Sequence, residues 1–172
     1  MAVLAQIMAV LLAYVYATAL EWSIHRYLFH GHGKRRGSPF AFHYVQHHGA
    51  CRRGNMTDPD YLRSGLRWSP RTREIGGIVG LTLLHMPLAL LSWAAFLVLV
   101  VHGARYIYLH HRSHVDVNWA KRRLPWHYDH HMAPNQDANW CVTSGWFDKL
   151  MGTRTPYLTV QGQDPNRDDL AV

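Results

Sequence analysis

Two long stretches without charged side chains divide the polar parts of the chain. Residues 2–20 form an uncharged run of 19 residues, and residues 76–101 form a second run of 26. An uncharged apolar run of about 18 residues or more is the usual mark of a helix that can cross a membrane. Strand-like alternation is not what these runs show. The pattern predicts an all-α integral membrane protein with a large polar part.

The first run predicts a helix over residues 2–30, an interval that contains no Pro or Gly. Its apolar body is about 28 Å long at 1.5 Å per residue, close to the thickness of a bilayer core. Glu21, Arg26 and the basic residues 34–36 mark its exit from the membrane. Ala-Thr-Ala at 17–19 resembles a signal-peptide cleavage site, but no Lys or Arg precedes the run. A retained transmembrane helix is therefore expected.

The second run poses a topological question, because a single crossing would put residues 25–48 and 110–131 on opposite faces of the bilayer. Met86-Pro87 lies about a third of the way along residues 75–109. Proline removes a backbone donor and commonly breaks a helix. We therefore predict a membrane hairpin with arms at 75–85 and 88–109 that returns to its starting side. The first arm is short, so whether it spans the bilayer or only dips into it stays open.

The remaining segments predict a helical cap on one side of the membrane. Short helices are expected at 42–48 and 126–132, an irregular basic loop at 49–73, and a turn at 115–118. Residues 1–160 are predicted to form a single domain, followed by a disordered tail at 161–172.

The net charge of +7 is concentrated beside the apolar runs. Residues 34–73 contain nine Lys and Arg against Asp58 and Asp60. Such a bias typically marks the cytoplasmic side of a membrane protein and contact with anionic lipid. Nucleic-acid-binding motifs are missing, so no nucleic acid partner is expected. Cys51 and Cys141 are far apart in segments predicted to be cytoplasmic, which predicts reduced thiols.

Histidine is the residue type that indicates chemistry. Ten of the fourteen histidines fall into tight clusters, and imidazole is the commonest metal ligand in proteins. Ten are too many for one metal ion and suit two. We predict an all-histidine site for two metal ions whose ligands are His25, His30, His43, His47, His48, His110, His114, His127, His130 and His131.

Spacing suggests how these ligands are arranged. His43 and His47 are four residues apart and are predicted to share one helix face, with His48 serving a neighbouring site. Asp116 and Asp129 either hold ring N–H groups of ligating histidines, as carboxylates near metal sites commonly do, or face water. The remaining histidines are expected at membrane interfaces or beside the clusters: His32, His85, His102 and His111.

Such a ligand set exceeds what a structural zinc site needs, since those sites usually have four ligands and often include Cys. A histidine-rich, carboxylate-poor set is neutral, so the charge of the metals stays exposed to what binds them. Beneath a membrane surface, the site would meet a lipid chain arriving from the bilayer. Hydroxylation or desaturation of an unactivated C–H bond is the chemistry that fits.

Four histidine motifs in this order resemble the membrane fatty acid hydroxylase / sterol desaturase superfamily, closest in kind to fatty acid 2-hydroxylases. The first is E-W-x-x-H-R-Y-x-F-H at 21–30, followed by H-x3-H-H at 43–48, H-x3-H at 110–114 and H-x2-H-H at 127–131. N-W-C-V-T-S at 139–144 and W-F-D-K-L at 146–150 are similar to the family's ending. Cys141 stands where that ending usually has glycine.

The resemblance implies an O2-dependent oxidoreductase in which the ten histidines bind two metal ions and no other residue is catalytic. Iron is expected, with zinc in a purified or inactive form. The substrate would be a fatty acyl, ceramide or related lipid, with electrons from a separate cytochrome b5- or ferredoxin-type donor and its reductase. A multi-pass protein with its active site on the cytoplasmic side is expected. Two alternatives stay open: a carotenoid or sterol hydroxylase or desaturase using the same site, and a non-catalytic membrane metal-binding protein.

Overall fold

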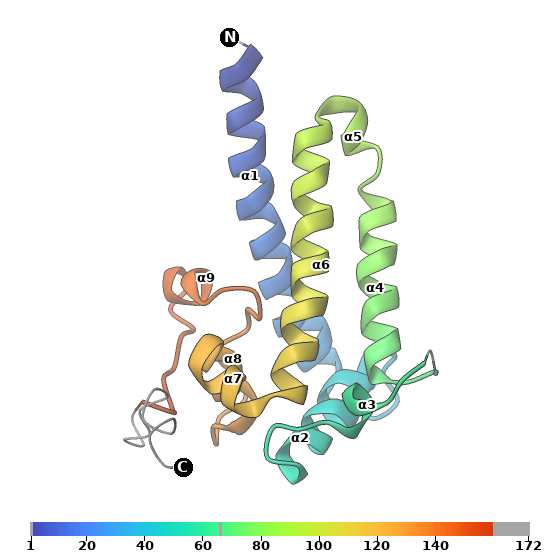
Figure 1. Ribbon diagram of the computed structural model, residues 1–172, viewed down its shortest axis with the longest axis vertical. Coiled ribbons are helices and arrows are strands. Elements are labelled where there is room, and N and C mark those ends of the chain that lie inside the picture. Colours follow the sequence, from blue (N-terminus) through green and yellow to red (C-terminus); the bar gives the residue numbers. More distant parts are fainter. Residues whose placement is uncertain (1, 66, 160–172) are drawn as a thin grey trace.

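A bundle of three tall helices stands on a compact layer of short ones (Figure 1). The computed structural model describes residues 2–65 and 67–159, and within those residues the ordered elements are all helical, as predicted. The predicted disordered tail at 161–172 lies outside them. The tall helices are α1 (Ala2–Ser23), α4 (Pro70–Leu84) and α6 (Trp93–Val115).

The first helix changes its winding where the first histidine motif begins. α1 continues directly into the π-helix η1 (Ile24–His32), and a second π-helix, η2, covers Phe42–His48. The sequence predicted ordinary helices in both places. A π-helix forms i→i+5 hydrogen bonds, so residues five apart lie closer to one face than they do in an α-helix. π-helical turns are rare and occur frequently at functional sites.

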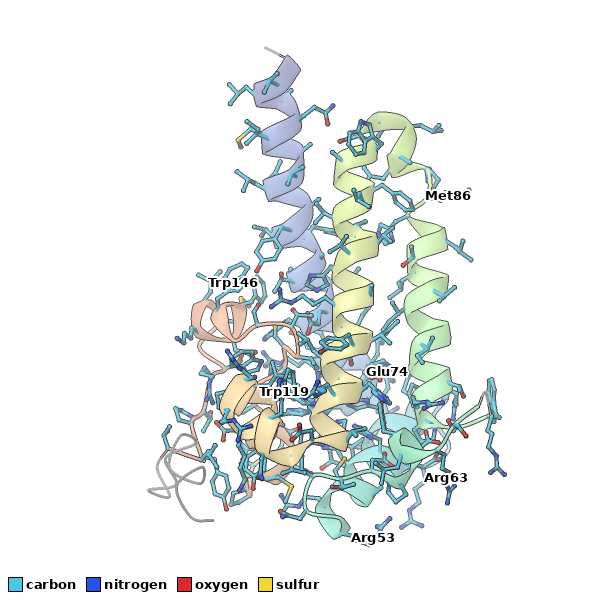
Figure 2. The ribbon with its side chains drawn as sticks, in the orientation of Figure 1. Arg53, Arg63, Glu74, Met86, Trp119 and Trp146 are labelled. Atoms are coloured by element: carbon cyan, nitrogen blue, oxygen red, sulfur yellow. The ribbon has the colours of Figure 1, made fainter. Side chains whose placement is uncertain are left out.

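The chain reverses between α4 and α6, as the hairpin prediction required. The short α5 (Leu88–Leu91) and Met86 lie at the tip, far from Arg53 and Arg63 at the other end of the molecule (Figure 2). α4 begins with a capping box between Ser69 and Thr72 and has Pro70 in its first turn. The two arms start and end beside the same layer of short helices, so histidines distant in sequence lie at one end.

The layer of short helices contains more ordered structure than the sequence predicted. The expected loop at 49–73 includes α2 (Gly49–Arg53), α3 (Pro59–Leu62) and the start of α4. Asp58 caps α3 by accepting a hydrogen bond from the Asp60 amide, a local signal that hydrophobic periodicity does not report. The turn predicted at 115–118 falls at Asp116, where α6 ends and α7 (Val117–Arg123), which was not predicted, begins. It is followed by α8 (Pro125–Met132) and α9 (Trp146–Leu150).

The two ends of the molecule differ in what they expose. Two helices, Val3–His32 and Trp93–Val115, are long and apolar enough to cross a membrane. Large apolar side chains on and between them point outward, with Leu90 90% exposed and Leu12 63% exposed. At the opposite end, by contrast, ten of the twelve largest fully buried side chains are histidines. The large buried side chains at that end are therefore mainly imidazole rings.

Candidate metal centre

All ten predicted ligands come together in one buried cluster, each at most 1% exposed. Nine of them sort into two groups, and within each group one ring nitrogen per residue lies within 4.8 Å of the others. Group one comes from η1, η2 and α8, and group two from η2, α6 and α8. Group one contains His25, His30, His43, His48 and His130. Group two contains His47, His110, His114 and His131, with His127 beside it.

The π-helices explain how group one assembles. His25 and His30 are five residues apart in η1, and His43 and His48 are five residues apart in η2. The wider turn brings each pair toward the same group, whereas His47 points into group two. The prediction that His43 and His47 share one helix face, with His48 serving a neighbouring site, is therefore corrected: His43 and His48 belong to group one and His47 to group two.

The inner nitrogens of the rings face one another at distances that suit metal coordination. Nε2 of His25 lies 3.0 Å from Nε2 of His43, and Nε2 of His48 lies 3.2 Å from Nε2 of both His30 and His130. Ligand nitrogens about 2.0–2.1 Å from a shared metal ion lie roughly 3.0–3.4 Å apart. The spacing in group one matches that range.

Buried ring nitrogens also remain without protein partners in group two. Nε2 of His110 and both ring nitrogens of His131 have no hydrogen-bond partner within the described part of the chain, although these residues are fully buried. An unpaired buried polar atom is costly, and a metal ion removes that cost. The donor set therefore fits bound metal.

Two of the five outer nitrogens of group one donate to backbone carbonyl oxygens, whereas those of His30 and His43 face the carboxylates of Asp137 and Glu74 at 3.3 and 3.6 Å. The Nδ1–H of His25 donates to the Trp140 carbonyl at 2.5 Å, and that of His130 donates to the Ala138 carbonyl at 2.7 Å. These contacts fix the tautomer in which Nε2 is free to bind metal. The carbonyls belong to the motif segment at 139–144 and the residue before it.

Two of the four outer nitrogens of group two donate to buried carboxylates. The Nδ1–H of His47 donates to Asp58 at 2.7 Å, and that of His110 donates to Glu74 at 2.6 Å. The Nδ1–H of His114, also in group two, donates instead to the Met56 carbonyl at 2.8 Å. A carboxylate behind an imidazole makes it a more basic ligand.

The pKa of His47 in group two is shifted upward, whereas those of His43 and His130 in group one and of His131 in group two are shifted downward. Burial lowers the pKa of His43 to about 4 and that of His130 to about 3, so both rings are neutral at pH 7, as a metal ligand must be. For His47, burial also lowers the pKa, but Cys51 and Asp58 raise it to about 10. The surroundings of His47 therefore favour a positive charge, which a metal ion at Nε2 supplies in place of a proton.

Two acidic residues hold the motif segment at 139–144 in place. Glu21, which opens the first motif, accepts hydrogen bonds from the amides of Val142 and Thr143 at 2.5 and 2.9 Å. Asp148 accepts from the amides of Trp140 and Cys141, both at 2.8 Å. Together they clamp the segment that supplies carbonyls to group one.

Cys141 is compatible with this clamp. Its side chain is fully buried, in a cluster with Trp22, Trp140 and Phe147. The backbone strain of the segment lies elsewhere, at Asn139, whose φ is +59°. Asparagine tolerates this left-handed conformation better than most residues.

The prediction that Asp116 and Asp129 hold histidine rings is wrong. Asp116 caps α7 through the Trp119 amide and pairs with Arg112. Asp129 is buried, but its oxygens contact the Leu158 amide and Arg154, so it fixes the segment after α9.

Glu74 and Asp58 are the carboxylates that the sequence reasoning missed. Glu74 is the sole acidic residue between Asp60 and Asp116, at the start of the second apolar run. A lone carboxylate at the edge of such a run is costly to bury without a partner, and this was an available signal. The Asp-Pro pair at 58–59 indicated only a turn.

The histidines not predicted as ligands have other partners. His102 bonds Glu21 at 2.8 Å and thereby ties α6 to α1, and His85 bonds the Tyr16 hydroxyl at 2.8 Å. His111 is partly exposed and His32 is exposed. Neither of the two histidine groups includes any of these residues.

An apolar pocket of about 290 Å³ leads to the histidines from between α1, α4 and α6. Its lining includes His25 of group one together with Glu74 and Tyr106. Binding pockets are typically apolar with a few convergent polar groups, and this one has that character. Its apolar walls include Leu20, Ile24, Leu28, Ile78, Leu81 and Leu99.

Comparisons with known proteins assign no family. No protein-family model, curated protein or solved structure matches the chain. The buried histidine groups could hold metal ions, and the geometry of these groups is what any functional conclusion must rest on.

Proposed function

We propose that this protein is a membrane-bound, O2-dependent oxidase of lipid C–H bonds that uses two iron ions held by the ten histidines. The observation that carries the proposal is an apolar pocket lined by His25, a member of group one, and by Glu74, the carboxylate that contacts His110 of group two. The order of the histidine motifs resembles that of the fatty acid hydroxylase / sterol desaturase superfamily and supports the same proposal.

The protein residues would hold, orient and shield the reacting centre. The imidazoles supply neutral ligands, and the carbonyl and carboxylate partners keep each Nε2 aimed inward. The apolar pocket walls exclude water and orient an acyl chain with one carbon near His25. When bound, the irons supply O2 activation, by which a C–H bond becomes C–OH and the second oxygen atom becomes water with two electrons and two protons. A separate donor protein supplies the electrons.

The membrane setting follows from the same arrangement. We propose that α1 spans the bilayer and that the α4–α6 hairpin enters it from the cytoplasmic side. α4 has 15 residues, about 22 Å of helix, which is shorter than the roughly 30 Å hydrocarbon core, so its tip dips into the bilayer. The pocket between these helices would then receive a lipid chain directly from the membrane.

Lipid analysis of cells with and without the gene, followed by assay of the purified protein, tests the proposal. We expect a hydroxylated lipid that accumulates only with the wild-type chain, and O2 uptake by the iron-loaded protein. A desaturated lipid would assign the same site to desaturation. Metal binding without O2 uptake or product after iron loading would contradict enzymatic activity and leave a non-catalytic metal-binding protein.

A further inference from the structure

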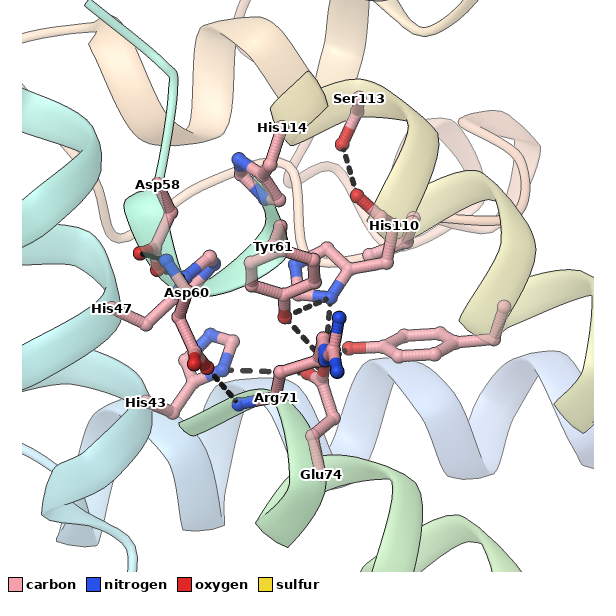
Figure 3. Close-up of polar contacts among 12 residues, drawn as sticks. His43, His47, Asp58, Asp60, Tyr61, Arg71, Glu74, His110, Ser113 and His114 are labelled. Carbon is pink, nitrogen blue, oxygen red and sulfur yellow. Dashed lines mark hydrogen bonds and ion pairs between the residues drawn. The ribbon is translucent and has the colours of Figure 1, made fainter. Parts of the chain in front are cut away.

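One carboxylate, Glu74, contacts ligands from both histidine groups (Figure 3). Its Oε2 accepts a hydrogen bond from Nδ1 of His110, in group two, at 2.6 Å. Its Oε1 lies 3.6 Å from Nδ1 of His43, in group one. Glu74 is 5% exposed, so its charge is not screened by water. No other carboxylate within the described residues contacts both groups in this way.

Two tyrosines complete the surroundings of this carboxylate. The Tyr61 hydroxyl donates to Oε2 at 3.0 Å and the Tyr106 hydroxyl donates to Oε1 at 2.7 Å. All four neighbours are donors once the histidines bind metal through Nε2. A carboxylate offers only acceptors and satisfies all of them, whereas an amide would turn an N–H group toward at least one.

The start of α4 holds Glu74 in place. The capping box between Ser69 and Thr72 fixes the first turn, and the Arg71 amide donates to Asp60 at 3.0 Å. Glu74 therefore lies on a helix anchored to α3, and its position is set before any ligand binds. Groups that orient metal ligands act best from such rigid elements.

Glu74 also forms part of the pocket wall, next to Tyr106 and His25. We propose that Glu74 is a positioning residue that links the two metal ions to each other, so that both are bound more weakly when its charge is removed. One negative charge shared between both groups offsets part of the repulsion between two cations. The proposal rests on the two-metal site of the proposed function.

Metal titration of Glu74→Gln against Asp58→Asn tests the link. Among the ten clustered histidines, Asp58 contacts only His47, in group two, so it is the matched control. Purified detergent-solubilised protein would be titrated with Co²⁺ in competition with a chelator, following absorbance and metal content. Loss of such a partner typically weakens metal binding 10–100-fold. We expect that weakening for both ions in Glu74→Gln and for one ion in Asp58→Asn.

The outcomes separate this inference from the proposed function. A wild-type chain that binds two ions, together with Glu74→Gln that binds both as wild type or weakens only one, overturns the link. A wild-type chain that binds fewer than two ions overturns the two-metal site and the link together. If Glu74→Gln does not fold, as judged by helical circular dichroism, Tyr106→Phe replaces it. That variant should change the Co²⁺ spectrum of both ions, and an unchanged spectrum overturns the link.

Discussion

The two histidine groups consist of the same type of ligand but differ in the hydrogen-bond acceptors that contact the outer ring nitrogens. In group one, His25 and His130 donate to backbone carbonyls of a loop segment. In group two, His47 and His110 donate to buried carboxylates. Two ligands of group one therefore depend on the correct folding of residues 138–144. Two ligands of group two are held instead by buried carboxylates, one of which, Glu74, also lies 3.6 Å from His43 in group one.

Because of this difference, the two metal ions need not bind with equal affinity. Carboxylates raise the basicity of the imidazoles that they hold, whereas neutral carbonyls orient the ring with less effect on its basicity. We expect the ion in group two to bind more tightly and the ion in group one to respond more to changes in the loop.

Removing a ligand from either group should have the largest effect. His130→Ala should cost the group-one ion and His114→Ala the group-two ion, and each variant should lose product formation, because the proposed reaction needs both. Metal content and lipid product measure this. Membrane fractionation should show both variants still membrane-bound. Normal turnover in either variant would refute the ligand assignment.

Loosening the loop should affect group one more than group two. Glu21→Gln removes a buried charge that accepts from the amides of Val142 and Thr143 and from the Thr143 hydroxyl. The loss of about 2–3 kcal/mol should lower Tm by roughly 5–10 °C. The group-one ion should then be released faster to a chelator, measured by competition. Equal release from both groups would show that the loop does not selectively hold group one.

The smallest effect is expected at Asp129, a buried carboxylate outside both groups. Asp129→Asn weakens the contact with Arg154, at 2.8 Å, and leaves the histidine partners unchanged. Tm should fall by about 2–6 °C, with both ions retained at wild-type affinity. A loss of either ion, measured by metal analysis, would restore the role first predicted for this residue.

The histidines were predictable because metal ligation leaves dense local clusters in the sequence. H-x3-H-H at 43–48 and H-x2-H-H at 127–131 each bring several imidazoles together within two turns of helix, so their presence at one site needed little tertiary information. The division between groups was not predictable from α-helical spacing. The wider turn of η1 and η2 decides it, pairing His43 with His48.

The hairpin could also be inferred, because only a reversal near Pro87 brings residues 25–48 and 110–131 to one end. The contacts of the carboxylates with the histidines could not be inferred. Asp58 and Glu74 each reach a histidine that is 11 or more residues away in sequence, through contacts that no periodicity records. Asp129 looked suitable because it lies next to His130, yet its side chain points toward Arg154.

The number of iron ions per chain tests most simply whether the ten histidines hold two metal ions. The purified protein would be loaded with Fe²⁺ without oxygen, freed of excess metal, and analysed for iron and protein together. We expect two iron ions per wild-type chain and one in either His130→Ala or His114→Ala. One ion or none in the wild-type chain, or two ions in both variants, would contradict a two-metal site built from these histidines.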